Sequence, residues 1–119
     1  MGIACAGGNI SEDLYGVAPR SSIAMVKSTR GLYAISTNIM RGIRFLIDRA
    51  RELNKPLVIN ISLSTNDGAH NGASLLEQYV STIATLERVT IVIAAGNEGD
   101  TSHHRGGSLN EEENIYINV

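Results

Sequence analysis

The sequence predicts an α/β protein with a parallel sheet and helices on both faces. Short apolar segments typical of buried strands alternate with two longer segments in which apolar residues recur at helical spacing. The connections between successive strands are long enough to hold a helix, as the crossovers of a parallel sheet require. We therefore expect the order strand, helix, strand, helix, strand.

Length and composition are those of an ordinary globular chain. The 119 residues are 43% hydrophobic and 18% charged, with a formal net charge of −2, which suits at most one domain with a modest core. The basic residues are scattered along the sequence, so nucleic acid and membrane surfaces are not expected partners. The lone cysteine, Cys5, excludes an internal disulfide, fits a reducing compartment and is expected to be a small buried residue.

The first strand is predicted at residues 23–27, after a turn signal at 14–19. A helix follows from Ser36 or Thr37, both plausible N-caps, and ends before the Asn-Lys-Pro sequence at 54–56. Its apolar residues at 39, 43, 46, 47, 50 and 53 share one face, and its charged residues lie largely on the other.

The second strand is predicted at 57–63, where a continuous apolar run indicates a strand covered on both faces. A polar loop leads to a second helix, predicted from the spacing of Leu75, Leu76, Tyr79, Val80, Ile83 and Leu86. The third strand is predicted at 89–95. Beyond residue 100 the composition changes abruptly to a polar, acidic loop, and the alternating residues 115–119 indicate a further strand.

Ligands of parallel sheets gather at the carboxyl ends of the strands, where the segments 62–72 and 94–99 begin. The sequence Ala-Ala-Gly-Asn-Glu-Gly at 94–99 places an amide side chain directly after a buried strand, between glycines that permit a sharp turn. Such an amide can donate hydrogen bonds to a negative oxygen. On spacing alone, an ordinary turn asparagine is the favoured interpretation of Asn97.

Three segments, in this order, resemble the subtilisin-like serine proteases, or subtilases. They are Tyr-Gly-Val-Ala-Pro at 15–19 with Ile-Ala-Met-Val-Lys at 23–27, Val-Ile-Asn-Ile-Ser-Leu at 58–63, and Val-Ile-Ala-Ala-Gly-Asn-Glu-Gly at 92–99. The resemblance covers about residues 1 to 100 and implies part of a subtilisin-like three-layer catalytic domain. It also implies that the substrate is a polypeptide.

The resemblance assigns roles to individual residues. It makes Asn97 the side-chain donor of the oxyanion hole and Gly96 part of the substrate-binding cleft. It makes Ser62, Leu63 and Ser64 a strand end that pairs with the substrate backbone and forms a wall of the specificity pocket, although subtilases usually have glycine where Ser64 stands. Residues Gly31, Leu32 and Tyr33 roughly match the family's other substrate-binding edge.

The catalytic motifs of subtilases are absent from the sequence: there is no His-Gly-Thr, no Gly-Thr-Ser and no upstream aspartate strand. The resemblance therefore implies an internal fragment that is inactive by itself and whose partner is the remainder of the catalytic domain. Strands separated from their neighbours would leave unpaired edges, so self-association is expected.

Several residues imitate catalytic or metal-binding groups. Ser74 is expected to cap a helix, Ser108 to lie in a polar loop, His70 to form local hydrogen bonds and Asp67 to form a turn. The adjacent His103 and His104 have no further ligand nearby, so no metal site is expected. No cofactor is expected either, and the absence of a glycine-rich loop between the first strand and helix disfavours a flavodoxin-like or nucleotide-binding domain.

The stretch 56–79 resembles the clostridial germination-type (Csp-like) subtilases more closely than secreted subtilisin. That branch carries a jelly-roll insertion after the asparagine, so residues 101–119 are expected to be an exit loop and the insertion's first strand. The resemblance favours a cytoplasmic or spore-associated location over secretion. Because some members of the branch look like pseudoproteases, a binding or signalling module is the alternative function.

Overall fold

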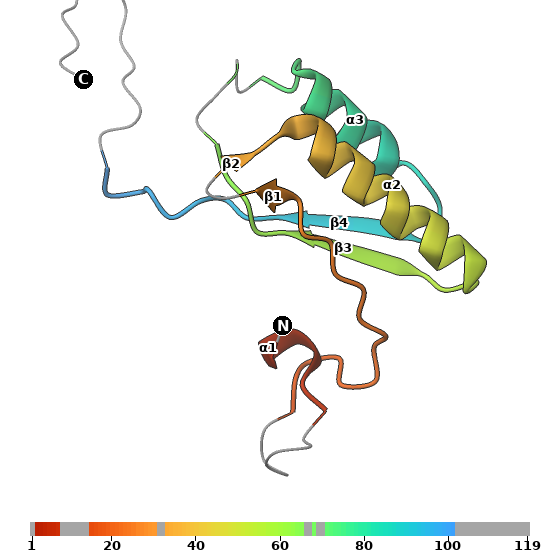
Figure 1. Ribbon diagram of the computed structural model, residues 1–119. Coiled ribbons are helices and arrows are strands. Elements are labelled where there is room, and N and C mark those ends of the chain that lie inside the picture. The colour runs from red at the N-terminus through yellow and green to blue at the C-terminus, as the bar shows by residue number, and fades with distance from the viewer. Residues whose placement is uncertain (1, 8–14, 31–32, 66–67, 69–70, 102–119) are drawn as a thin grey trace, which may run out of the picture.

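The computed structural model describes residues 2–7, 15–30, 33–65, 68 and 71–101. Strands β3 (Leu57–Ile61) and β4 (Val89–Ile93) pair in parallel, with Leu57 opposite Val89 and Ile61 opposite Ile93. Helix α3 (Leu75–Ala84) connects them, and α3 and the preceding helix α2 (Ser36–Glu52) cover them (Figure 1). The remaining elements are the helix α1 (Gly2–Cys5) and the antiparallel pair β1 (Thr29–Arg30) and β2 (Tyr33–Ala34). The predicted α/β class with a parallel sheet is confirmed.

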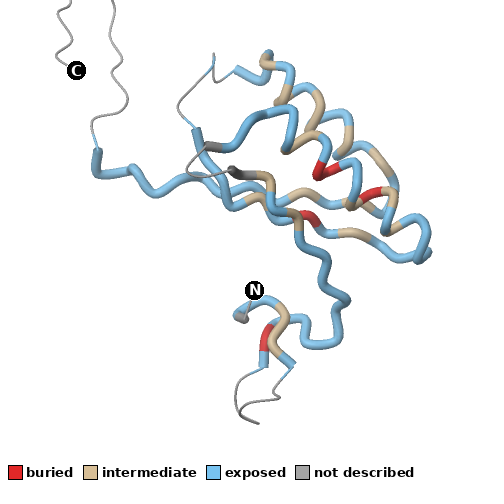
Figure 2. The backbone as a smooth tube through the Cα atoms, in the orientation of Figure 1, coloured by how far each residue is buried: buried red, intermediate tan, exposed pale blue. Residues whose placement is uncertain are grey.

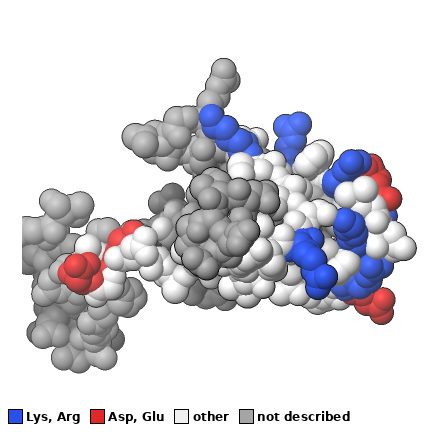
Figure 3. Space-filling view, turned by 90° about the horizontal axis from the view of Figure 1, so that it is seen from below, with Lys and Arg blue, Asp and Glu red and all other residues white. Residues whose placement is uncertain are grey.

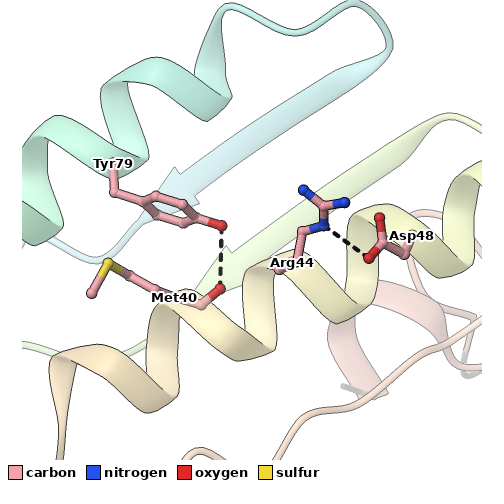
Figure 4. Close-up of polar contacts among 4 residues, drawn as sticks. All are labelled: Met40, Arg44, Asp48 and Tyr79. Atoms are coloured by element: carbon pink, nitrogen blue, oxygen red, sulfur yellow. Dashed lines mark hydrogen bonds and ion pairs between the residues drawn. The ribbon is translucent and has the colours of Figure 1, made fainter.

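Helix α2 matches its predicted length and faces. Ile43 and Ile47 are buried, whereas Arg44 and Asp48 form an exposed ion pair of 2.8 Å. The hydrogen bond that the Arg44 guanidinium donates to Asp48 raises the pKa of Arg44 (Figure 4). The N-cap prediction is wrong, because the capping position is held by Ile35 in an extended conformation without a side-chain hydrogen bond. Packing of the apolar face therefore stabilises this helix more than capping does.

Helix α3 begins with a capping box. The Ser74 hydroxyl accepts a hydrogen bond from the Glu77 backbone N–H at 3.3 Å, and the Glu77 carboxylate accepts one from the Ser74 backbone N–H at 3.0 Å. This reciprocal pair satisfies two N–H groups that the first helical turn leaves without partners, and it confirms the predicted capping role of Ser74. The Tyr79 hydroxyl donates to the Met40 carbonyl at 3.3 Å and ties α3 to α2 (Figure 4).

The core is small and lies between the two long helices and one face of the sheet. Ile43, Ile47 and Ile59 are its buried residues, at 3%, 2% and 4% exposure, and Figure 2 shows few other buried positions in the described part of the chain. Partly buried residues pack around them: Ile39, Leu46, Leu57, Ile61, Tyr79, Val80, Ile83, Leu86, Val89 and Ile91. Alternation along β3 turns Leu57, Ile59 and Ile61 toward the helices.

The strand predicted at 23–27 is not formed, and this prediction is wrong for the structure described. The segment 21–28 has no regular secondary structure. It lies against the layer formed by α2 and β3, because the Lys55 ammonium donates to the Ser22 hydroxyl at 2.6 Å and Val26 contacts Gly42. A short β-prone run gains stability only through pairing and burial, and here Ile23 and Met25 remain 54% and 72% exposed.

The expected burial of the second strand on both faces is also wrong for this chain. Val58 in β3 is 69% exposed and Val92 in β4 is 49% exposed. The reason is the position of the helices: α2 and α3 cover the same face of the sheet, and Figure 1 shows α1 on the opposite side, away from the strands. Residues 102–119, where the inserted domain was expected to begin, lie outside the described residues.

Candidate functional site

The carboxyl ends of β3 and β4 form one edge of the sheet, and the predicted site residues follow directly after them. The parallel ladder continues one step past the strands, since the Ala94 N–H donates to the Ile61 carbonyl at 3.1 Å. Ser62, Leu63 and Ser64 leave this edge from β3, and Gly96 and Asn97 leave it from β4, all of them exposed. The structure thus brings the two predicted segments to the same end of the sheet.

The segment after β4 turns sharply at Gly96, whose φ of 99° lies in the region that favours glycine. A further turn follows, because both the N–H and the hydroxyl of Thr101 donate to the Glu98 carbonyl, at 3.1 and 2.7 Å. The Asn97 backbone N–H donates to the Glu98 carboxylate at 3.0 Å. Asn97 is therefore an exposed turn residue, with no hydrogen-bond partner for its side-chain amide among the described residues.

Glu98 is a residue that the sequence analysis did not single out. Its carboxylate accepts the hydrogen bond donated by the Asn97 backbone N–H. A Cβ atom added at Gly96 would lie only 3.0 Å from the same carboxylate. The exposed carboxylate repels a negative oxygen that approaches Asn97, so binding there is favoured when the Glu98 side chain turns away. The only sequence feature that pointed to Glu98 was its position between Asn97 and Gly99 in the motif.

A groove of about 420 Å³ runs beside the end of β3. Its walls come from the segment 25–28, from α2 and from β3, and they include Ser62 and Leu63 but neither Ser64 nor the residues after β4. Within it, the Asn60 side-chain N–H donates to the Ser62 hydroxyl at 2.8 Å. The groove is mainly apolar, and Lys27, Asn60 and Ser62 are among the polar residues that line it.

Charged side chains of both signs gather at the other end of the molecule. Figure 3 shows Lys and Arg side chains, with Asp and Glu among them, at the end where β3 and β4 begin. There the Arg88 guanidinium donates to the side chain and the carbonyl of Asn54, at 2.9 and 3.0 Å. The strand ends that carry the predicted site lie away from this cluster, although Lys27 lines the groove together with Ser62. Asn97 and Ser62 themselves offer neutral hydrogen-bond donors.

The remaining candidate residues contribute little that the structure describes. Cys5 is a half-buried free thiol, which only partly matches its expected burial. Among the described residues, no group of His, Cys, Asp and Glu is placed to hold a metal ion. Gly31, Leu32, Asp67, His70, His103, His104 and Ser108 lie outside the described residues, as do the side-chain contacts of Tyr33.

Comparison with known proteins identifies the family of this chain. A family model described as "Subtilase family" matches residues 1–117. The chain belongs to the subtilase family. It is also similar to the solved structure of the Clostridium perfringens CspB protease, with 61% sequence identity and a TM-score of 0.87. That alignment covers 94% of this chain and 25% of the CspB chain.

The similarity confirms the predicted Csp-like branch of the subtilases. This chain spans only about a quarter of the length of the CspB chain that it matches. None of the curated proteins matches it.

Proposed function

We propose that this chain supplies the oxyanion-hole residue Asn97 and part of the substrate-binding cleft to a subtilisin-like serine endopeptidase. The observation that carries the proposal is that Asn97 leaves β4 at the same sheet edge at which Ser62 and Leu63 leave β3. Membership of the subtilase family gives this juxtaposition its chemical meaning. The substrate class is a polypeptide, whose peptide bonds the protease hydrolyses.

In this function the Asn97 amide donates to the oxygen of the tetrahedral intermediate, where negative charge develops. Gly96 allows the chain to turn immediately before it, and the end of β3 at 62–64 supports the substrate backbone. The nucleophile, the general base and the catalytic aspartate are contributed by residues other than these 119, since the sequence contains none of their motifs. An oxyanion donor without a nucleophile has no intermediate to stabilise, so the chain alone has no peptidase activity.

The test is the substitution Asn97→Ala in the protease that contains this chain. We expect kcat to fall about 10²- to 10³-fold, a range that itself comes from a subtilase, while KM changes little. Asn38→Ala, which removes an exposed amide from α2, is the matched control and should leave kcat unchanged. A loss below about threefold for Asn97→Ala would overturn the assignment.

The purified 119-residue chain provides the complementary test. A serine-directed fluorophosphonate should not label it, and labelling would show a nucleophile that the proposal denies. If the protease containing the chain bound peptides but hydrolysed none, that result would support the alternative of a germination-type binding or signalling module.

Two further partners belong to the proposal. The open face of the sheet, with Val58 and Val92 69% and 49% exposed, would be covered by the remainder of the catalytic domain. Without that cover the chain should self-associate in gel filtration. Replacing both valines with threonine should reduce the apparent mass, and an unchanged elution profile would point to a different contact.

A further inference from the structure

We propose that Asn60 is a positioning residue that acts through Ser62 and fixes its hydroxyl as a hydrogen-bond donor to the backbone of a bound peptide. This inference rests on the proposed function, because it assumes that a peptide lies along the end of β3. It adds a residue that no resemblance assigned.

The starting observation is the residue type. Strand β3 reads Leu-Val-Ile-Asn-Ile, so Asn60 is its one polar residue and is flanked by β-branched side chains. Asparagine is depleted in strands, and this one stands within the paired ladder, opposite Val92. Because an asparagine at this position weakens the strand, we expect a local interaction of its side chain to be the reason for its presence.

Geometry supplies that reason. Residues two apart on a strand lie on the same side, so Asn60 and Ser62 face away from the side of Ile59 and Ile61 that packs against the helices. The Asn60 amide donates to the Ser62 hydroxyl oxygen at 2.8 Å, and both residues line the groove beside β3. The contact joins the strand interior to the first residue beyond it.

The direction of this hydrogen bond determines what Ser62 can do. A hydroxyl has one hydrogen, and an oxygen that accepts from an amide keeps that hydrogen for another partner. Accepting a hydrogen bond also strengthens the hydroxyl as a donor. At the end of a strand, the matching acceptor is a backbone carbonyl of an extended peptide, so Asn60 orients Ser62 toward that carbonyl.

The substitution Asn60→Asp tests the direction with almost no change in size. A carboxylate only accepts hydrogen bonds, so Ser62 would donate to it and no longer to the peptide. In the protease that contains this chain, we expect KM to rise about three- to tenfold and kcat to stay within twofold, as for the loss of one neutral hydrogen bond made in both ground and transition states.

Three further variants separate this role from a structural one. Ser62→Ala should raise KM by a similar factor, and adding Asn60→Asp to it should cause no further rise, because both remove the same donor. Asn38→Asp makes the same amide-to-carboxylate change at the exposed start of α2, and KM should be unchanged. Melting temperatures of all variants should agree within a few degrees.

The outcomes are distinct. If Asn60→Asp raises KM as much in the Ser62→Ala background as in the wild type, or lowers kcat and the melting temperature instead, the positioning role is wrong. If Asn38→Asp has the same effect as Asn60→Asp, charge rather than hydrogen bonding is responsible and the inference also fails. A wild-type protease without turnover would instead refute the proposed function, and with it the substrate that this inference requires.

Discussion

The substitution Ile47→Ala tests whether the small core between α2, α3 and the sheet holds the chain together. Ile47 is 2% exposed and belongs to the buried cluster. Truncation removes the side chain beyond Cβ, which at about 0.8 kcal/mol per buried methylene amounts to roughly 2.4 kcal/mol. The cavity left behind adds to this loss, and the better helix propensity of alanine returns roughly 0.4 kcal/mol.

We therefore expect the free energy of unfolding to fall by about 3 kcal/mol, in the lower half of the range for such substitutions because the surrounding residues are only partly buried. The assay is urea unfolding of the 119-residue chain, followed by circular dichroism. With an m value of about 2 kcal/mol per molar, the midpoint should fall by roughly 1.5 M.

The matched control is Phe45→Ala on the same helix. Phe45 is 56% exposed, so its truncation should cost less than about 1 kcal/mol despite the larger side chain. Equal midpoints for the two variants would refute the reasoning, because they would show that α2 is not held by the face that carries Ile47.

Three other substitutions probe single contacts. Ser74→Ala should cost about 1 kcal/mol and speed amide hydrogen exchange at the start of α3, whereas Ser74→Asp should retain most of the stability; equal losses would argue against the capping box. Gly42→Ala should raise the melting temperature only in a Val26→Ala background, because alanine has the better helix propensity but its Cβ would lie 2.8 Å from Val26 Cγ1 in the wild type. The same rise in the wild-type background would contradict that contact. Arg88→Gly should be about 1 kcal/mol more stable than Arg88→Ala in urea unfolding, because the φ of 63° favours glycine and both variants lose the hydrogen bonds to Asn54; the opposite order would refute this.

The elements that the sequence predicts well are those whose signals are local. The spacing of Ile39, Ile43 and Ile47 defines the buried face of α2, and Ser74 with Glu77 marks the start of α3. The strand at 23–27 depends instead on pairing with a distant segment, and its own residues carry no information on whether that pairing forms. Burial of Val58 fails as a prediction for a similar reason, because it depends on what covers the far face of the sheet.

The sequence predicts where the candidate site lies, but it does not predict the chemistry of its residues. The alternation of strands and helices locates Asn97 and Ser62 at the carboxyl edge, and the structure agrees. Their roles come from family resemblance, since Asn97 in isolation has the geometry of a turn residue. The contacts of Glu98 with Asn97 and of Asn60 with Ser62 involve side-chain orientations that no spacing rule specifies, which is why the structure was needed to find them.

The exposure of Asn97 has a direct consequence for its energetics. An amide in water exchanges one hydrogen-bond partner for another at little net gain, whereas in a site shielded from water the same donor strongly stabilises a developing charge. The value of Asn97 therefore arises only when other parts of the protease and the substrate exclude water around it. It follows that Asn97→Ala should leave the urea midpoint of the 119-residue chain unchanged while it lowers kcat of the protease, and a matching loss of stability in the chain would show that Asn97 supports the fold instead of the reaction.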